Sequence, residues 1–373
     1  MSKLKVITVV GTRPEIIRLS CVIPLLDKYT NHVFVHTGQN YDYELNEIFF
    51  KDLALRQPDY FLKVDTSSLG HVLGETLIKI EDIINQEKPD AMLILGDTNA
   101  SISAIIAKRK HIPIYHMEAG NRSYDENVPE EINRKMIDHI ADFNLVYTEN
   151  SRRHLLSEGL PHRRIYLTGS PMFEVLERYM PKIENSIVLD TLSLKPKEYF
   201  LISVHREENV DYQDNLLKII EVLNQLAYQY KLPVIISTHP RTRNRIESIS
   251  NIKLDPLIQF LKPFGFLDYN WLQINSKCVI SDSGTISEES AILKFSAVTI
   301  RNSMERPEAI DAGTIILSGF DYDIVLQSIE LVINEAGKYA KICPEYEVEN
   351  TSQRVLKLIL GTAKLHKQWS GLY

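Results

Sequence analysis

The sequence predicts an α/β protein of two domains, each a doubly wound parallel sheet with helices on both faces. The chain has 373 residues, more than one typical domain holds. Short apolar, β-branched runs recur, and each is followed by a turn and a helical pattern, which is typical of buried parallel strands. The rhythm stops over residues 170–197, a mixed segment with three prolines, and then restarts.

Twelve runs are the predicted strands, six on either side of that segment. They are residues 4–10, 32–38, 91–96, 112–117, 143–148 and 164–169, and then 199–205, 234–240, 259–262, 277–284, 296–302 and 314–319. We therefore expect an N-terminal domain over residues 1–170 and a C-terminal domain over residues 171–350. A helix within about 351–373 is expected to pack back on the first domain.

Composition argues against several classes of protein. The formal net charge is −7, whereas proteins that mainly bind nucleic acid normally carry a basic excess. The cysteines, Cys21, Cys278 and Cys343, are too few and too scattered for a disulfide framework or a zinc site, so a reducing cytoplasm is expected. No apolar stretch reaches the ~18 residues that a membrane span needs. We expect neither nucleic acid nor membrane as a partner.

Ligands of open parallel sheets bind outside the carboxyl ends of the strands. Most unusual polar residues of this chain directly follow a predicted strand, and two sheets that face each other would gather them in one interdomain cleft. These residues are found at positions 11–13, 96–98, 116, 118, 205–206, 239–240 and 282–284.

SDSGTISEES, residues 281–290, ends a strand and begins a helix. Backbone amides at a helix start, together with the hydroxyls around Ser283, Gly284 and Thr285, would suit a phosphate. A capping box, with Ser or Thr at the N-cap and Glu three residues later, would account for the same residues. Glu289 could instead accept hydrogen bonds from ribose hydroxyls.

Arginines and histidines follow other strands. Arg13 in GTRPE offers paired donors to a phosphate, and Arg18 follows about one turn later. Arg306 lies in RNSMERPEA; a surface arginine beside a helix cap or in a solvated loop is the alternative. His205 in HREEN and His239 in STHP end strands of the second half, although a single histidine is more often a core or surface residue than a catalyst.

Asp97, Glu118 and Glu130 come just after strands or in a loop that leaves one. Carboxylates that are close together and partly desolvated have raised, separated pKa values suited to acid–base catalysis. Alternatively, Asp97 caps a helix that begins at Asn99, and Glu130 merely opens the next helix. A metal site of Asp97, Glu118 and His205 would fit no established ligand spacing.

Taken together, these segments resemble the non-hydrolysing UDP-N-acetylglucosamine 2-epimerase family. The similar motifs, in order over nearly the whole chain, are GTRPEIIRLS, LGDTN, HMEAGNR, PEEINR, TGSPM, VHREEN, STHP, SDSGTISEES and ERPEAIDAGT. The resemblance implies the GT-B architecture, two Rossmann-like domains with the active site between them and UDP on the second. It implies an isomerase that inverts C2 of a UDP-linked 2-acetamido sugar and needs neither NAD nor metal.

The resemblance also implies a mechanism and roles for residues. UDP is eliminated to give a 2-acetamidoglucal-type intermediate, and then adds back while a proton reaches the other face of C2. Asp97, Glu118 and Glu130 match the catalytic carboxylates, and His205 matches the catalytic histidine. The diphosphate clamp is matched by Arg13, Arg18, Arg306 and Ser283-Gly284-Thr285, with Glu289 on the ribose and Tyr269 near the uracil.

One stretch bears on the substrate. Family members that form UDP-N-acetylmannosamine usually carry Gln-His-Arg-Glu where this chain has Gln39-Asn40-Tyr41-Asp42. HTGQNYDYELNEIFF and HMEAGNR are more similar to the branch that converts UDP-2-acetamido-2,6-dideoxy-L-talose to UDP-N-acetyl-L-fucosamine for capsule or O-antigen. We expect that substrate and, by family likeness, a homodimer. UDP-N-acetylglucosamine as substrate, a GT-B glycosyltransferase and a non-catalytic UDP-sugar sensor are the alternatives.

Overall fold

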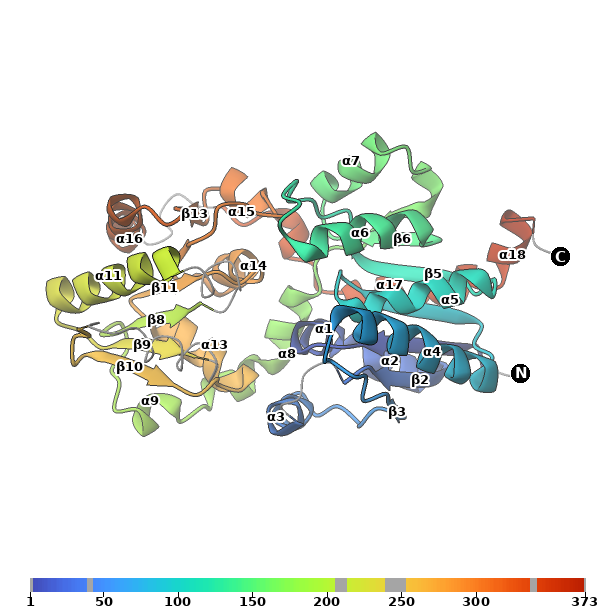
Figure 1. Cartoon of the computed structure of the whole chain (residues 1–373), viewed down its shortest axis with the longest axis horizontal. Helices are drawn as coiled ribbons and strands as arrows, with labels where there is room; N and C mark the ends of the chain where they lie inside the picture. The colour runs from blue at the N-terminus through green and yellow to red at the C-terminus, as the bar shows by residue number, and fades with distance from the viewer. Residues whose placement is uncertain (1–2, 39–42, 205–212, 239–252, 336–340, 372–373) are drawn as a thin grey trace. The chain divides into compact units, whose positions relative to one another are not determined.

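A computed structural model describes residues 3–38, 43–204, 213–238, 253–335 and 341–371 (Figure 1). The chain forms two compact units, Met1–Arg178 with Pro344–Tyr373, and Tyr179–Cys343. The first division falls within helix α8 (Met172–Glu184), whereas the sequence analysis put it after residue 170. The proline-containing segment between the predicted domains is thus partly helical, and Pro181 lies inside α8.

The first unit contains a seven-stranded sheet of order β3-β2-β1-β4-β5-β6-β7, and its strand pairs are parallel. Its strands are β1 (Lys5–Val10), β2 (Asn31–His36), β3 (Tyr60–Phe61), β4 (Ala91–Leu95), β5 (Ile114–Ala119), β6 (Phe143–Val146) and β7 (Ile165–Leu167). β4 and β6 are buried along their whole length, which explains why their sequences are continuous apolar runs rather than alternating ones. The six strands predicted for this half are present; β3, only two residues long, was missed.

Helices cover both faces of this sheet, with α4, α5 and α6 on one face and α2 and α17 on the other (Figure 1). The helical segments are α1 (Arg13–Leu19), α2 (Val22–Tyr29), α3 (Tyr43–Asp52), α4 (Leu69–Glu87), η1 (Asn99–Ser103), α5 (Ala104–Arg109), α6 (Pro129–Ile140), α7 (Glu149–Ser157), η2 (His162–Arg164), η3 (Pro344–Tyr346), α17 (Thr351–Thr362) and α18 (Leu365–Trp369).

The C-terminal segment is an integral part of the first unit. α17 packs against α2 and buries Val355, Leu356 and Ile359. At the start of α17, the Thr351 hydroxyl lies 3.2 Å and 3.1 Å from two backbone carbonyl oxygens, those of Thr168 and Ser170. The final thirty residues or so therefore close a core that the first 178 residues begin.

The second unit contains a six-stranded sheet of order β10-β9-β8-β11-β12-β13, whose pairs are also parallel. Its strands are β8 (Phe200–Ser203), β9 (Val234–Ser237), β10 (Ile258–Leu261), β11 (Cys278–Ser281), β12 (Ala297–Thr299) and β13 (Ile316–Leu317). Its helices, after α8, are α9 (Val188–Thr191), α11 (Gln213–Tyr230), α13 (Phe266–Asn275), α14 (Ile286–Leu293), α15 (Glu308–Asp311) and α16 (Tyr322–Glu335).

Buried side chains of α11 and α16 form one core with β8, β9, β11 and β12. The predicted fold class, α/β with two parallel sheets covered by helices, is confirmed. Across the described ranges, every helix falls short of the length and apolar character that crossing a membrane would require.

Candidate functional site

In each sheet, the strand order reverses at one point, and some of the predicted site residues follow the strands beside it. The reversal lies between β1 and β4 in the first unit and between β8 and β11 in the second. Such reversal points open a crevice at the carboxyl ends of the strands, where α/β proteins bind ligands. Arg13 follows β1, Asp97 follows β4, and the Ser283–Thr285 turn follows β11.

Glu118 lies at an irregular end of β5. The register of β5 against β6 shifts between Met117 and Ala119, and Glu118 itself has a left-handed backbone with φ of 67°. Its carboxylate forms an ion pair with Arg18, whose guanidinium also lies 5.9 Å from the Tyr147 ring centroid. Both side chains of the pair are almost completely buried. Two of the predicted site residues are therefore brought into direct contact.

Asp97 is held by helix α6. Arg134 donates two hydrogen bonds to one Asp97 carboxylate oxygen, from Nε at 3.0 Å and Nη2 at 2.6 Å, and Asn133 donates to the Asp97 backbone carbonyl at 2.9 Å. The N-cap of the following helical turn is Thr98, whose hydroxyl accepts from the Ala100 amide. The alternative that Asp97 caps this turn is therefore wrong.

Glu130 lies in the first turn of α6, exposed, one turn before Arg134. Its neighbour Glu131, which the sequence analysis did not select, is completely buried. It accepts hydrogen bonds from the Ser123 amide and hydroxyl, both at 3.0 Å, and from Arg134 Nη1 at 2.6 Å. Burial opposes ionisation of Glu131, but these donors and the Arg134 charge lower its pKa. Glu131 thus fixes both the acidic loop and the arginine that holds Asp97.

Glu15 is a second buried carboxyl group that the sequence analysis did not select. One of its oxygens accepts from the Gly11 amide at 2.9 Å and from the Thr12 amide and hydroxyl at 2.7 Å and 2.9 Å, while Thr98 donates to the other at 3.1 Å. Burial raises the pKa of Glu15 to about 7, against the effect of those hydrogen bonds. Glu15 therefore occupies the amides of the GTRPE turn itself and joins that turn to the loop that carries Asp97.

Arg13 begins α1 and is half-buried, with its guanidinium 5.6 Å from the Phe49 ring centroid. The loop amides beside it are already taken by Glu15. A phosphate in this unit would therefore have to rely on arginine side chains rather than on the turn's backbone.

The remaining described residues of the predicted site lie in the second unit. The Ser283 and Thr285 hydroxyl oxygens are 2.9 Å apart, and the Thr285 amide donates to Ser283 Oγ at 3.3 Å. Thr285 precedes α14 but makes no side-chain capping hydrogen bond, so the alternative interpretation of this segment as a capping box is wrong. Arg306 donates to the Gly284 carbonyl at 3.1 Å, which places this arginine directly at the turn.

Glutamates connect this turn to its neighbours. Glu288 forms an ion pair with Arg306 at 2.7 Å, and both side chains are buried. Glu289 accepts from Gln273 Nε2 at 2.7 Å, and Gln273 lies one turn after Tyr269 on α13. Burial and then the Glu289 charge raise the pKa of Tyr269, while a hydrogen bond with Ser203 opposes the shift. The predicted residues of the second unit thus lie close together: Arg306, the Ser283–Thr285 turn, Glu289 and Tyr269. Gln273 belongs to the same group, and the sequence analysis did not select it.

Two predicted residues, His205 and His239, lie outside the described residues, as does the tetrapeptide Gln39–Asp42. The three-residue metal site that included His205 lies partly outside them as well. Among the side chains that the structure does describe, no group of three or more His, Cys, Asp or Glu residues is arranged to hold a metal ion.

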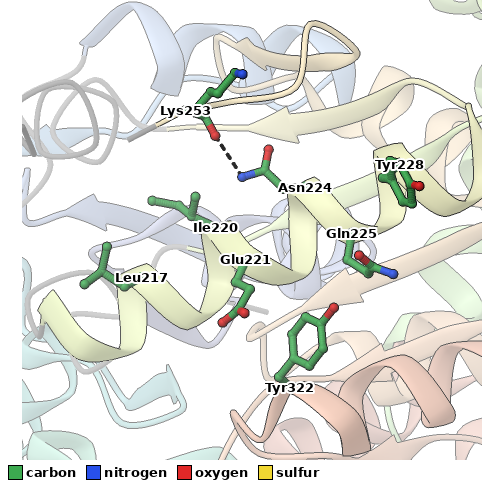
Figure 2. Close-up of a pocket in the computed structure, with 8 residues that line it drawn as sticks. All are labelled: Leu217, Ile220, Glu221, Asn224, Gln225, Tyr228, Lys253 and Tyr322. Carbon is green, nitrogen blue, oxygen red and sulfur yellow. Dashed lines mark hydrogen bonds between the residues drawn. The ribbon is translucent and has the colours of Figure 1, made fainter. Parts of the chain in front are cut away.

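A pocket of about 390 Å³ opens elsewhere in the second unit, between α11, Lys253 and Tyr322 (Figure 2). Leu217, Ile220, Glu221, Asn224, Gln225 and Tyr228 of α11 line it, and Asn224 donates to the Lys253 carbonyl at 3.0 Å. None of the predicted site residues contributes to its wall. Its lining comes from two helices and from Lys253 rather than from strand ends, so we do not assign the chemistry to it.

Comparison with known proteins decides the family. The model of the family described as UDP-N-acetylglucosamine 2-epimerase matches residues 26–360. The chain belongs to that family. A solved structure titled UDP-N-acetylglucosamine 2-epimerase from Rickettsia bellii is 47% identical, covers 98% of each chain and has a TM-score of 0.92.

Other relatives of this epimerase-family chain are more distant. A structure of Methanocaldococcus jannaschii UDP-GlcNAc 2-epimerase, in complex with UDP-GlcNAc and UDP, is 32% identical with a TM-score of 0.89 and covers 96% of this chain and 100% of its own. The UDP-2,3-diacetamido-2,3-dideoxy-D-glucuronate 2-epimerase of Pseudomonas aeruginosa is 34% identical over 87% of this chain and 92% of its own. The predicted family and the predicted enzyme class, an isomerase, are confirmed.

Proposed function

We propose that this family member inverts C2 of a UDP-linked 2-acetamido sugar by eliminating UDP and adding it back. The observation that carries the proposal is the pair of ionic contacts at the strand ends of the first unit, Arg18 with Glu118 and Arg134 with Asp97. Each arginine fixes the position of its carboxylate through charge-assisted contacts. Glu130 supplies a third carboxylate from the turn of α6 before Arg134.

The chemistry explains why several carboxylates are needed. The C2 proton is not next to a carbonyl, so it becomes removable only as the C1–O bond to UDP loosens and positive charge develops at C1. One carboxylate takes the proton while UDP leaves with the bonding electrons, and a C1=C2 double bond forms. UDP then adds to C1 as a second acid delivers one proton to the opposite face of C2. Positioned acids and bases of this kind contribute about 10²–10⁴-fold in rate.

In this proposal the second unit binds UDP. The Ser283-Gly284-Thr285 turn, Arg306 and His205 contact the diphosphate, Glu289 the ribose and Tyr269 the uracil side, and His239 is an additional contact. Arg13 and Arg18 of the first unit complete the cationic clamp. Cations suit this role because charge-assisted hydrogen bonds stabilise the departing anion. The close arrangement of Arg306, Gly284, Glu289 and Gln273 supports the assignment.

For the sugar, we propose UDP-2-acetamido-2,6-dideoxy-L-talose, with UDP-N-acetyl-L-fucosamine as product and capsule or O-antigen synthesis as the setting. The support is the sequence similarity around residues 36–50 and 116–122. UDP-N-acetylglucosamine is the second candidate, and the Methanocaldococcus jannaschii complex with UDP-GlcNAc and UDP favours it. The same proposal includes a cytoplasmic location and a homodimer. Light scattering of the purified protein would test the homodimer.

The decisive experiment incubates the protein with each sugar nucleotide in D₂O and follows the products by NMR. We expect a C2 epimer with deuterium at C2 from the true substrate. A glycosyltransferase would leave C2 unlabelled, and a sensor would bind the sugar nucleotide without turnover. The substrate that gives the larger kcat/KM decides between the two candidates.

Two isosteric variants test the carboxylates. We expect Asp97→Asn and Glu118→Gln each to lower kcat by about 10²–10⁴-fold, because each removes a proton acceptor and keeps the side-chain shape. Glu126→Gln is the matched control, since Glu126 is exposed in the same acidic loop. If Asp97→Asn or Glu118→Gln turned over at the wild-type rate, the substituted residue would have no catalytic role.

A further inference from the structure

We propose that Asp138 is a positioning residue that holds the end of β5 in the conformation that presents Glu118. The inference rests on the proposed role of Glu118 as a catalytic carboxylate. Asp138 lies on α6 and is completely buried. It is not at a strand end and has no access to a ligand, so its charge must serve other protein groups.

The contacts of Asp138 surround Glu118 along the chain. Its two carboxylate oxygens lie 3.3 Å and 3.1 Å from the Gly120 amide, which donates to them. One of them accepts from Arg122 Nη1 at 2.7 Å, and the other lies 2.9 Å from His116 Nδ1, which makes no hydrogen bond with it. One carboxylate thus contacts residues two positions before, two after and four after Glu118.

Glu118 needs such support because its backbone is unfavourable. A left-handed φ costs a residue with a side chain roughly 1–2 kcal/mol, and it persists where the surroundings fix it. Glu118 has φ of 67°, and Gly120 follows with φ of 82°. The hydrogen bonds from the Gly120 amide to Asp138 hold this turn closed. Without them, β5 could relax toward an extended end, and the Glu118 carboxylate would move with it.

The same carboxylate is linked to the Asp97 loop. His116 Nε2 lies 2.9 Å from the Gly96 carbonyl oxygen, and because a carbonyl can only accept, the ring nitrogen donates. Gly96 directly precedes Asp97. Helix α6, which carries Asp138, also carries Arg134, the partner of Asp97. Asp138 therefore connects the supports of both carboxylates.

Glu158 provides a matched control. Arg122 is buried between two carboxylates, since its Nε and Nη2 donate to Glu158 at 2.7 Å and 2.6 Å. Burial alone would lower the pKa of Arg122, but the hydrogen bond to Glu158 and the Asp138 charge raise it overall. Removing the Glu158 charge removes one carboxylate from Arg122, as removing the Asp138 charge does. It leaves the Gly120 and His116 contacts of Asp138 in place.

The test compares Asp138→Asn with Glu158→Gln in the full chain, with the better of the two sugar nucleotides as substrate. We expect Asp138→Asn to lower kcat by about 10²-fold, the loss typical of a reacting group displaced by about 1 Å, with KM within about threefold of wild type. Proton abstraction then limits turnover more strongly, so the kinetic isotope effect with C2-deuterated substrate should rise. Glu158→Gln should retain kcat within about threefold and the wild-type isotope effect.

A structural role alone would lower the amount of active enzyme without changing the isotope effect. A fall in kcat with an unchanged isotope effect, or an equal fall in Glu158→Gln, would therefore overturn the inference. If Asp138→Asn does not fold, His116→Phe removes only one contact of Asp138, and the Gly96 carbonyl keeps the Ser101 hydroxyl at 3.0 Å. We expect a smaller fall in kcat and a raised isotope effect there; wild-type kinetics would count against the inference.

Glu118→Gln separates this inference from the proposed function. If Glu118→Gln turns over like wild type, the catalytic role of Glu118 fails, whatever Asp138→Asn does. If Glu118→Gln is inactive and Asp138→Asn behaves like Glu158→Gln, the proposed function survives and the role of Asp138 fails.

Discussion

The Glu15 carboxyl group lies beneath the turn after β1 with only 1% of its surface exposed, and burial raises its pKa from 4.5 to about 7. The folded chain therefore holds this proton more tightly than the unfolded chain does. The stability that results is complete below pH 4.5 and is lost as the pH rises through about 7. The contribution of Glu15 to the free energy of unfolding therefore falls toward neutral pH. Glu15 is joined to the loop that carries Asp97, on which the proposed chemistry depends.

Glu15→Gln should remove this dependence. Between pH 5.5 and pH 8, we expect the free energy of unfolding of the wild type to fall by about 1–2 kcal/mol more than that of the variant. Urea unfolding at both pH values measures the difference. Glu126→Gln, at an exposed glutamate, should follow the wild type. Parallel losses in the wild type and Glu15→Gln would show that Glu15 does not titrate in this range.

The limits of sequence analysis are clearest for such residues. GTRPE was interpreted through Arg13, and neither Glu131 nor Asp138 was selected as a site residue. Charged residues are normally exposed, so their type gives no sign of burial. The chemical role of a buried charged residue depends on the groups that it contacts. For Asp138 these groups belong to residues 116–122, at and after the end of β5. Asp97 and Glu118 could be selected as candidates because they follow apolar runs that end at one edge of a sheet.

Among the elements, the end of β5 depends on close contact with α7. A Cβ added to Gly120 would lie 2.4 Å from the Ser151 backbone carbonyl oxygen, and the φ of 82° disfavours a side chain as well. Backbone cannot move aside as the end of a flexible side chain can. The turn that follows Glu118 therefore admits only glycine.

Gly120→Ala should destabilise the protein by about 2–5 kcal/mol, the sum of an unfavourable φ and an overpacked contact. Gly159→Ala is the matched control, since Gly159 has φ of 86° and open space around its Cβ position. We expect about 1–2 kcal/mol there, from the backbone alone. Urea unfolding of both variants gives the comparison; equal losses would mean that the Ser151 contact relaxes without cost.

Strands were the elements that the sequence predicted best, because strands that are buried on both faces consist of continuous apolar runs. β3 escaped because Tyr60 and Phe61 form too short a run to register. The bulge at Glu118 also escaped, since it arises from the register of β5 against β6 and from contacts with α6. The pairing of two elements that are far apart in the sequence cannot be predicted from the residues of either element alone.

For the whole molecule, the C-terminal segment contributes substantially to stability. α17 buries Val355, Leu356 and Ile359, and each large apolar side chain contributes about 1.5–3 kcal/mol when buried. A whole domain is typically stable by only about 5–15 kcal/mol. Loss of this one helix would therefore consume much of the margin of the first unit.

Deleting residues 344–373 should unfold the first unit and spare the second. Hydrogen exchange followed by mass spectrometry should show rapid exchange throughout β1, β4 and β5 while β8 and β11 stay protected. A chain that ends at Ser370 should exchange like the wild type, because Gly371 is exposed. Protection of β1 in the larger deletion would show that the first 178 residues fold without their C-terminal partner.

A ribosome makes a protein from the N-terminus to the C-terminus. Because the first unit is built from two separate segments of the chain, the order of synthesis affects when each unit can fold. Residues 179–343 emerge as one uninterrupted stretch and can complete their own core during translation. The opening 178 residues must wait, with the face of α2 uncovered, until the very last helices leave the exit tunnel. The unit that is synthesised first is thus the unit that completes its folding last. A product truncated before α17 would expose apolar surface on α2, far in sequence from the point of truncation.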